Sequence, residues 1–249
     1  MVSVIIPTYN RPQLLLRALR SLQRQLYPDW EALVVDDGNG SGILAAHSLR
    51  DPRIIGVRNQ GQGQVEARNT GLAQASGQII ALLDDDDWWL DPTHLHRVVR
   101  ALKARAGLVY RGGYLLLERD GLELERIPFD HQATPHSLLR DNHLLATGAA
   151  YPRALHDQLG PFDPEMADYW DWDWYLRVSR AGYPLIQLPG RGVAVSVHGA
   201  NMSYAARLEE RRRNLEKLAQ KHGLGQLELK DHRIIAGAAG YRPRKRIAS

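Results

Sequence analysis

Four apolar runs in the first third of the chain are separated by polar and helical segments. The runs cover residues 2–6, 31–35, 53–57 and 79–83, and their short length and β-branched content predict buried parallel strands. Leu15, Leu19 and Leu22 follow the helical repeat after the first run, and residues 65–75 predict a helix before the fourth. Residues 39–42 and 59–63 are rich in Gly, Asn and Gln and predict loops. The alternation of strands and helices indicates a doubly wound, mostly parallel α/β sheet.

The pattern changes after a helix that is expected over residues 91–105. Runs at 108–117 and 122–128, joined by Glu118-Arg119-Asp120-Gly121, predict a hairpin. Further strands are expected at 145–151 and 193–197, and further helices at 171–181 and 204–222. No clear linker divides the chain. We therefore expect a single domain over residues 1–230, in which a smaller mixed half extends the first sheet, and a basic tail over 231–249.

Four consecutive aspartates, Asp84 to Asp87, follow directly on the fourth apolar run. Neighbouring carboxylates repel one another, and each raises the pKa of the next, so a cation among them would stabilise the cluster. Mg²⁺ and Mn²⁺ prefer such oxygen ligands. Because α/β sheets bind ligands at the carboxyl ends of their strands, the aspartates predict a metal site at that edge of the sheet. A solvated acidic turn is the alternative interpretation.

Two other strand ends should meet the aspartates, since right-handed crossovers bring the loops to one edge. The first strand is followed by Pro7-Thr8-Tyr9-Asn10, and the second by Asp36 and Asp37. An aromatic ring can stack on a base, and a carboxylate can accept hydrogen bonds from a base or a ribose. Capping of loops by Asp and Asn is the alternative, and these residues taken alone favour it.

The segment Trp170-Asp171-Trp172-Asp173-Trp174-Tyr175 contains three of the six tryptophans of the chain. Desolvation by large apolar side chains raises the pKa of a carboxyl group, which is how a general base is tuned, and the rings could stack on a sugar. Packing of the tryptophans in the core explains the pattern at least as well, whereas Asp171 favours a functional role. His198, at a strand end, could contact a metal or a phosphate, but a lone His is more often structural. The same alternative applies to Arg68 and Asn69.

Composition and charge exclude several classes of protein. The 249 residues contain no cysteine, which excludes disulfides and thiolate chemistry, and no apolar run of the ~18–20 residues that a membrane span needs. The N-terminus lacks the features of a secretory signal, and we expect a cytoplasmic protein. Part of the formal net charge of +4 lies in Arg242-Pro243-Arg244-Lys245-Arg246. This tail could contact the inner face of a membrane, a solubilising end is the alternative, and no nucleic-acid-binding motif accompanies the charge.

Taken in order, these segments resemble the family 2 glycosyltransferases, which are inverting enzymes with the GT-A fold. The matching stretches are residues 4–11, 34–38, 67–71, 75–77, 83–88, 160–163 and 171–173, followed by His198. No single stretch is diagnostic, but the ordered set is highly specific and spans roughly residues 2–204. The resemblance implies a nucleotide-sugar-binding half at about 1–105, an acceptor and catalytic half at about 106–204, and a C-terminal helix at 204–222.

The resemblance also implies a role for each candidate residue. The nucleotide would be bound by Pro7, Tyr9, Asp36, Asp37, Arg68, Asp84 and Asp85. A metal, Mn²⁺ or Mg²⁺, would be bound by Asp84, Asp86 and His198, with Asp86 the most direct ligand. Asp171 would be the general base. Many relatives have Glu directly before that Asp, and Trp170 stands here instead, which leaves the class of acceptor open.

These roles predict an inverting, metal-dependent transfer of a sugar from a nucleotide diphosphate sugar, with a UDP-sugar favoured. The acceptor would be a hydroxyl of a glycan or lipid-linked molecule in surface polysaccharide biosynthesis. A single displacement inverts the anomeric centre, whereas a covalent intermediate would retain it. The alternatives are a non-catalytic nucleotide-sugar-binding module or partner subunit, and a nucleotidyltransferase. The latter would be expected to have a glycine-rich phosphate loop where Thr8-Tyr9-Asn10-Arg11-Pro12 stands.

Overall fold

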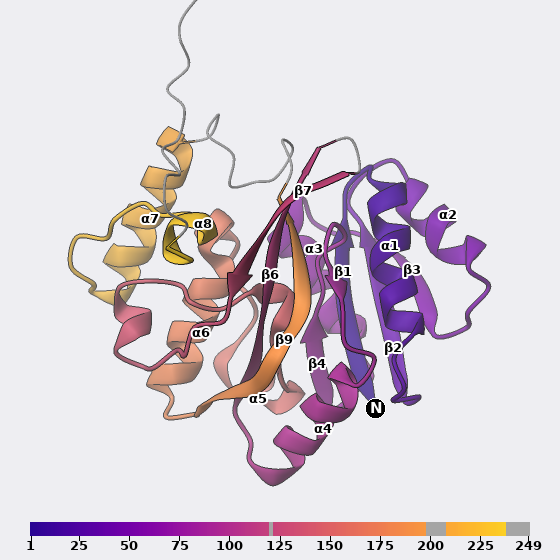
Figure 1. Cartoon of the computed structure of the whole chain (residues 1–249), viewed down its shortest axis with the longest axis horizontal. Helices are drawn as coiled ribbons and strands as arrows, with labels where there is room; N and C mark the ends of the chain where they lie inside the picture. Colours follow the sequence, from indigo (N-terminus) through magenta and orange to yellow (C-terminus); the bar gives the residue numbers. More distant parts are fainter. Residues whose placement is uncertain (120–121, 198–207, 238–249) are drawn as a thin grey trace, which may run out of the picture.

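The computed structural model describes residues 1–119, 122–197 and 208–237. Within these ranges nine strands form one sheet in the order β3-β2-β1-β4-β8-β6-β9-β5, with β7 paired to β6 (Figure 1). The strands are β1 (Val2–Thr8), β2 (Trp30–Asp36), β3 (Ile54–Arg58), β4 (Ile79–Leu82), β5 (Trp88–Trp89), β6 (Leu108–Arg119), β7 (Leu122–Phe129), β8 (Ala150–Pro152) and β9 (Leu185–Val197). The chain therefore builds a single mixed sheet rather than two separate ones.

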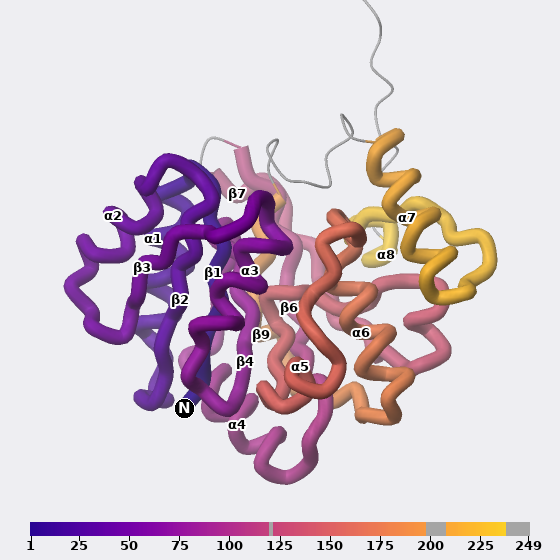
Figure 2. Tube along the Cα trace, turned by 180° about the vertical axis from the view of Figure 1, so that it is seen from behind, coloured from indigo at the N-terminus to yellow at the C-terminus, as the bar shows by residue number. Residues whose placement is uncertain are grey.

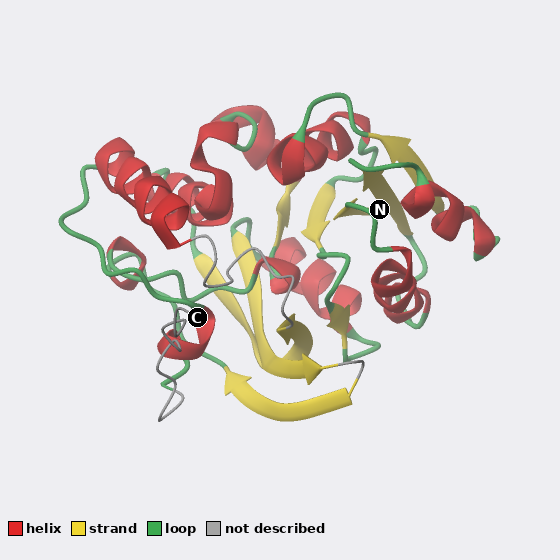
Figure 3. Cartoon of the chain, turned by 90° about the horizontal axis from the view of Figure 1, so that it is seen from above, coloured by secondary structure: helices red, strands yellow, loops and turns green. Residues whose placement is uncertain are grey.

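Helices cover both faces of this sheet (Figures 1 and 2). They are α1 (Pro12–Gln23), α2 (Ser41–Ser48), α3 (Gly63–Gln74), α4 (His94–Ala104), α5 (Arg153–Leu159), α6 (Trp170–Arg180), α7 (Leu208–His222) and α8 (His232–Ile235), with 3₁₀ turns η1 (Ser137–Leu139), η2 (Ala146–Gly148) and η3 (Pro164–Tyr169). Figure 3 shows the strands lying between helices on opposite sides. None of the helices in the described ranges has the length and apolar character needed to cross a membrane.

The first four strands form the parallel part of the sheet. β1 pairs in parallel with β2 and β4, and β2 pairs in parallel with β3. Along β1, Val4 and Ile6 contribute to the core under α1 and α4, whereas Ile5 contributes to the core under α3 and α6. Side chains of a strand alternate between the two faces of the sheet, and here both faces are covered. This double burial explains why the first run is continuously apolar, and it confirms the predicted doubly wound half.

The second half extends the same sheet with mixed strand directions. β8 pairs antiparallel with β4 and β6, and β6 pairs antiparallel with β7 but parallel with β9. The predicted hairpin is therefore confirmed as β6 and β7. The prediction of a smaller mixed half that continues the first sheet is also confirmed.

Several boundaries differ from the sequence prediction. The predicted loop at 39–42 is wrong at its end, because Ser41 and Gly42 begin α2. The predicted strand at 145–151 is largely wrong, since η2 occupies its centre and only the short β8 follows. The strand expected at 193–197 is the end of the much longer β9. The start of the helix expected at 204 and the basic run 242–246 lie outside the described residues.

The loops after β1, β2 and β4 meet at one edge of the sheet, as the topology predicted. The backbone N–H of Asp37 donates to the carbonyl of Thr8 over 2.9 Å, and the Thr8 hydroxyl donates to Asp85 over 2.7 Å. Because these strands are parallel and in register, their carboxyl ends deliver three polar loops to the same place. This edge contains the candidate site.

Candidate active site

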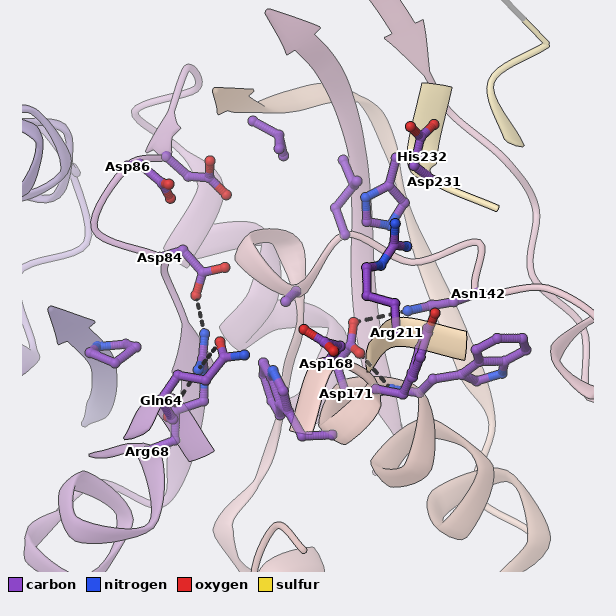
Figure 4. A pocket seen from close by; sticks show the side chains of 18 of the residues that line it. Gln64, Arg68, Asp84, Asp86, Asn142, Asp168, Asp171, Arg211, Asp231 and His232 are labelled. Carbon is purple, nitrogen blue, oxygen red and sulfur yellow. Dashed lines mark hydrogen bonds and ion pairs between the residues drawn. The ribbon is translucent and has the colours of Figure 1, made fainter. Parts of the chain in front are cut away.

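A cavity of ≈ 280 Å³ opens at the carboxyl ends of the parallel strands. Its lining residues between 7 and 87 form one wall, here called the aspartate wall. Those between 141 and 172 and between 211 and 235 form the opposite wall, here called the helix wall. Figure 4 shows Asp84 and Asp86 on one side of the cavity and Asp171 on the other. Its volume lies near the lower end of the ~300–1,000 Å³ that is typical of ligand clefts.

The four consecutive aspartates have different surroundings. Asp85 is buried, and burial raises its pKa to about 7 against the opposing effect of Arg11. Asp87 is also buried; it accepts a hydrogen bond from the Ser196 N–H over 3.0 Å, and burial raises its pKa well above the usual range. The Asp84 side chain is 31% exposed. The side chain of Asp86 is 11% exposed and that of Asp85 1%, so Asp84 is the most accessible of these three carboxylates and Asp86 the next.

Arg11 supplies positive charge to this acidic run. Its Nη2 and Nε lie 2.5 and 3.2 Å from the two carboxylate oxygens of Asp85, and its Nη1 lies 2.9 Å from Asp86 Oδ2. A cation among the aspartates was expected from the sequence, whereas Arg11 was not predicted to supply the positive charge. Within the described residues, no three His, Asp or Glu side chains are grouped as metal ligands. In this structure a guanidinium group therefore stabilises part of the acidic run.

Arg68 connects the two walls of the cavity. It is 2% exposed, and its Nη1 donates to the carbonyl and side-chain oxygens of Gln64 over 3.0 and 3.1 Å. Its Nη2 forms an ion pair with Asp84, and its Cζ lies 4.0 Å from the centre of the Trp170 ring. A cation over an aromatic ring is stabilising by ~0.5–2 kcal/mol. Trp170 therefore packs against the guanidinium group that holds Asp84.

Asp171 lies in the first turn of α6 on the helix wall. Its Oδ2 accepts a hydrogen bond from Asn142 Nδ2 over 2.9 Å, and its Oδ1 accepts one from the Trp172 N–H over 2.8 Å. The side chain is buried, and burial raises the pKa of Asp171 to about 6 although both hydrogen bonds lower it. Asp171 is therefore mostly ionised at neutral pH and can accept a proton. Asn142 was not predicted, because nothing in the sequence links it to a residue so distant in the chain.

Asp173, two residues further along α6, points away from the cavity. Its carboxylate is fully buried and lies 2.7 Å from His222 Nε2, 2.7 Å from Lys221 Nζ and 3.0 Å from Arg177 Nε. Residues i and i+2 of a helix lie on different faces, so one carboxylate reaches the cavity and the other joins α6 to α7. All three tryptophans belong to the buried core cluster, and Trp170 and Trp172 also line the cavity.

The residues predicted to bind the nucleotide are only partly brought together. Pro7, Tyr9 and Asp37 line the cavity, and Tyr9 is 60% exposed. Asp37 accepts hydrogen bonds from Asn59 Nδ2 over 2.6 Å and from the Gly63 N–H over 2.9 Å. Asp36 is not among the lining residues.

Asp36 instead stabilises the start of α2. Its buried carboxylate accepts hydrogen bonds from the N–H groups of Gly38 and Gly42, each over 2.7 Å, and of Ile43 over 3.3 Å. A Cβ atom on Gly42 would lie 2.9 Å from Asp36 Oδ2, so this approach requires glycine. The structure therefore supports the capping interpretation for this aspartate.

The C-terminal segment contributes residues to the helix wall that the sequence analysis did not predict. Arg211, Lys230, Asp231 and His232 line the cavity, and Arg211 Nη2 donates to the Lys230 carbonyl over 3.1 Å. Burial lowers the pKa of His232 to about 4, so this side chain is neutral at pH 7. His198, which was predicted to contact the metal, lies outside the described residues.

Comparison with known proteins identifies the family. Residues 3–122 match the model of the family described as glycosyl transferase family 2. YwdF of Bacillus subtilis (strain 168), described as an uncharacterized glycosyltransferase, is 32% identical over 241 residues, which cover 94% of this chain and 88% of YwdF. The chain belongs to the family 2 glycosyltransferases. In this glycosyltransferase the family match covers the aspartate wall, and the alignment with YwdF extends over most of the chain.

Two further comparisons are informative for this glycosyltransferase. WfgD of Escherichia coli, named a UDP-Glc:alpha-D-GlcNAc-diphosphoundecaprenol beta-1,3-glucosyltransferase, is 29% identical over 177 residues, or 69% of this chain and 68% of WfgD. The mannosyltransferase PcManGT of Pyrobaculum calidifontis, solved with GDP-Man and Mn²⁺, superposes with a TM-score of 0.66 at 23% identity, covering 90% of this chain and 65% of that chain. This likeness shows the shared GT-A fold. The matches to three other relatives are partial, and they cover 36% to 74% of this chain and 33% to 63% of the relative.

Proposed function

We propose that this glycosyltransferase moves a sugar from a UDP-sugar to a hydroxyl group of a glycan or lipid-linked acceptor by a single inverting displacement. One observation carries the proposal: a buried carboxylate, Asp171, lies across the cavity from the aspartate wall (Figure 4). The cavity thus separates a group that can accept a proton from a group of carboxylates suited to a donor and its metal.

Asp171 acts as the general base in this proposal. A general base is most effective when its pKa lies near the working pH, and the pKa of Asp171 is about 6. The carboxylate accepts the acceptor's hydroxyl proton while the acceptor oxygen forms a bond to the anomeric carbon. The bond between that carbon and the diphosphate breaks, and its electron pair leaves with the diphosphate. Asn142, at 2.9 Å, fixes the carboxylate in position.

The donor's nucleotide binds against the aspartate wall. Tyr9 offers an exposed aromatic ring for stacking on a base, and Asp37 offers a carboxylate to base or ribose donors. The name of WfgD includes a UDP-sugar donor, which supports UDP as the nucleotide. The same name includes an acceptor sugar on a lipid diphosphate, which supports an acceptor used in the biosynthesis of a surface polysaccharide.

The donor atoms at Asp84 and Asp86 fit Mg²⁺ or Mn²⁺. Both ions prefer carboxylate oxygens, and such ions often use one or two protein carboxylates together with substrate phosphates and water. A site of two carboxylates is therefore sufficient, although Asp84 also forms an ion pair with Arg68 and Asp86 contacts Arg11 over 2.9 Å. When bound, the ion would neutralise charge on the leaving diphosphate. The Mn²⁺ in the PcManGT complex supports this part of the proposal.

Two measurements test the proposed function. Calorimetry with UDP, GDP, CDP and dTDP, with and without Mn²⁺, should show metal-dependent binding of UDP that Asp86→Ala weakens. Asp157→Ala is the matched control, because Asp157 is exposed on α5 and does not line the cavity. Proton NMR of the product should show an anomeric configuration opposite to that of the donor. Absence of nucleotide binding, or a product that keeps the donor's configuration, would contradict the proposal.

A further inference from the structure

Thr147 contacts the run of four aspartates from η2, in the second half of the chain. The residue is buried and does not line the cavity. It also lies outside residues 3–122, which match the family model. Because its side chain does not reach the cavity, any role of Thr147 in the reaction is exerted through its neighbours.

The hydroxyl of Thr147 joins the two ends of the aspartate run. Its oxygen accepts a hydrogen bond from the Asp84 N–H over 3.0 Å. Burial raises the pKa of Asp87, and a hydrogen bond that the Thr147 hydroxyl donates to this carboxylate opposes the rise. Between the two ends the chain turns tightly, since the Asp87 N–H donates to the Asp84 carbonyl over 3.1 Å. One hydroxyl therefore braces the turn that presents Asp84 and Asp86 to the cavity (Figure 4).

The backbone around Thr147 is held from both sides of the run. The buried indole of Trp89, which follows the aspartates, donates from Nε1 to the Thr147 carbonyl over 2.8 Å. The Leu82 N–H, on the strand that precedes the aspartates, donates to the Ala149 carbonyl over 3.0 Å. These contacts fix the position from which the hydroxyl reaches the two ends of the turn.

Both contacts of the side chain require a hydroxyl group. A hydroxyl can donate one hydrogen bond and accept two, so it serves an N–H and a carboxylate at once. Val has the same shape but can make neither bond. In Thr147→Val the Asp84 N–H would lose its acceptor, and Asp87 would keep the hydrogen bond from the Ser196 N–H over 3.0 Å but lose the one from the hydroxyl. The turn would then be less firmly held at both ends.

Building on the proposed function, we propose that Thr147 is a positioning residue for the metal site, because its hydroxyl fixes the turn from which Asp84 and Asp86 bind the ion. Groups that orient metal ligands without touching the ion typically contribute ~10–100-fold to metal affinity. Arg17 holds the middle of the run separately, through a hydrogen bond to the Asp86 carbonyl over 2.8 Å. Loss of the Thr147 hydroxyl therefore weakens metal binding and does not abolish it.

The test measures the Kd for Mn²⁺ from the electron paramagnetic resonance signal of the free ion, with UDP equimolar to the protein and UDP alone as the blank. In Thr147→Val this Kd should rise ~10–100-fold. In Thr147→Ser, which keeps the hydroxyl, it should stay within about threefold of the wild-type value. The Kd for UDP without metal, measured by calorimetry, should change less than about threefold in both variants, because Thr147 does not line the cavity.

Ser21→Ala is the matched control. The Ser21 hydroxyl is also buried and also accepts a backbone N–H close to the run, that of Trp89 over 3.1 Å. It donates to the Ala18 carbonyl over 2.7 Å rather than to an aspartate. Its removal should lower Tm and leave the Kd for Mn²⁺ within about threefold of the wild-type value. Thr147→Ala is measured as well, so that a variant without the hydroxyl remains if Thr147→Val does not fold.

An unchanged Kd for Mn²⁺ in a folded variant that lacks the Thr147 hydroxyl would overturn the inference. An equal loss of Mn²⁺ affinity in Thr147→Ser or in Ser21→Ala would also overturn it, because the effect would then come from packing. Absence of Mn²⁺ binding in the wild type with UDP would overturn the proposed metal site and this inference with it. Failure of the proposed function is therefore seen in the wild type, and failure of the inference alone is seen only in the variants.

Discussion

Replacing Asn142 with Ala should shift the pH dependence of transfer without removing the base. Asn142 donates to Asp171 over 2.9 Å, and this hydrogen bond stabilises the ionised carboxylate. A hydrogen bond to a charged group contributes ~1.5–3 kcal/mol, and ~1.36 kcal/mol corresponds to one pKa unit. Because water can partly replace the amide, we expect a rise of about one unit, from the value of about 6 in the wild type.

The direction of the shift in the pH profile follows from the role of Asp171 as the base. A base is inactive when protonated, so a higher pKa moves the acid limb of the profile to higher pH. At pH 6.5 ionisation alone should make kcat/KM about threefold lower in Asn142→Ala than in the wild type, and this factor should vanish above about pH 8.5. The assay is initial-rate transfer from UDP-sugar between pH 5 and 9.

Asn214→Ala is the matched control for Asn142→Ala. Asn214 donates to Asp168 over 2.8 Å, so the same amide is removed from a neighbouring carboxylate on the same wall. This variant should leave the acid limb in place. If the acid limb of Asn142→Ala coincides with that of the wild type, the assignment of the limb to Asp171 is wrong.

Three further predictions concern the supports of the site. Asp173→Asn removes the charge of a fully buried carboxylate that joins α6 to α7. We expect the free energy of unfolding to fall by about 3 kcal/mol, which calorimetry would show as a fall in Tm of ~6–12 °C, and a fall in Tm below about 2 °C would contradict this prediction. Asp36→Ala should lower the free energy of unfolding by ~1–2 kcal/mol, while the affinity for UDP stays within about threefold of the wild-type value. A much weaker affinity for UDP would instead indicate that Asp36 contacts the nucleotide. Arg11→Gln should increase the rise in Tm on adding Mn²⁺, because a competing cation is removed; an equal rise would argue against a metal at Asp86.

The parallel half of the fold was predictable because local pattern and topology agree there. Runs such as residues 2–6 are buried on both faces, so their apolar character is continuous and easily recognised. The helix α2 was less visible, since Leu44 is exposed and Gly40 and Gly42 indicate a loop. Its start depends on hydrogen bonds from Gly42 and Ile43 to the side chain of Asp36 at the end of β2, which the apolar pattern does not reveal.

The candidate site was predictable where it lies at strand ends and not where it depends on long-range contacts. The aspartates, Tyr9 and Asp171 stand out by residue type and position. Asn142 donates a hydrogen bond to Asp171, and Arg211 lines the cavity. Both positions depend on how the second half of the chain folds, which local patterns do not indicate. Arg11 lies in the segment that was predicted to follow the first strand. Its ion pairs with Asp85 and Asp86 depend on how closely the loops after β1 and β4 approach each other. Such pairings are set by packing and cannot be derived from local patterns.

The most direct test of the account is transfer by Asp171→Asn compared with the wild type at pH 7.5, with UDP binding measured on both. The amide keeps the size of the side chain but cannot accept the proton. We predict a loss of ~10²–10⁴ in kcat, the usual contribution of a general base. The affinity for UDP with Mn²⁺ should stay within about threefold, because Asp171 lies on the opposite wall. Transfer at the wild-type rate would contradict the assignment of Asp171 as the base.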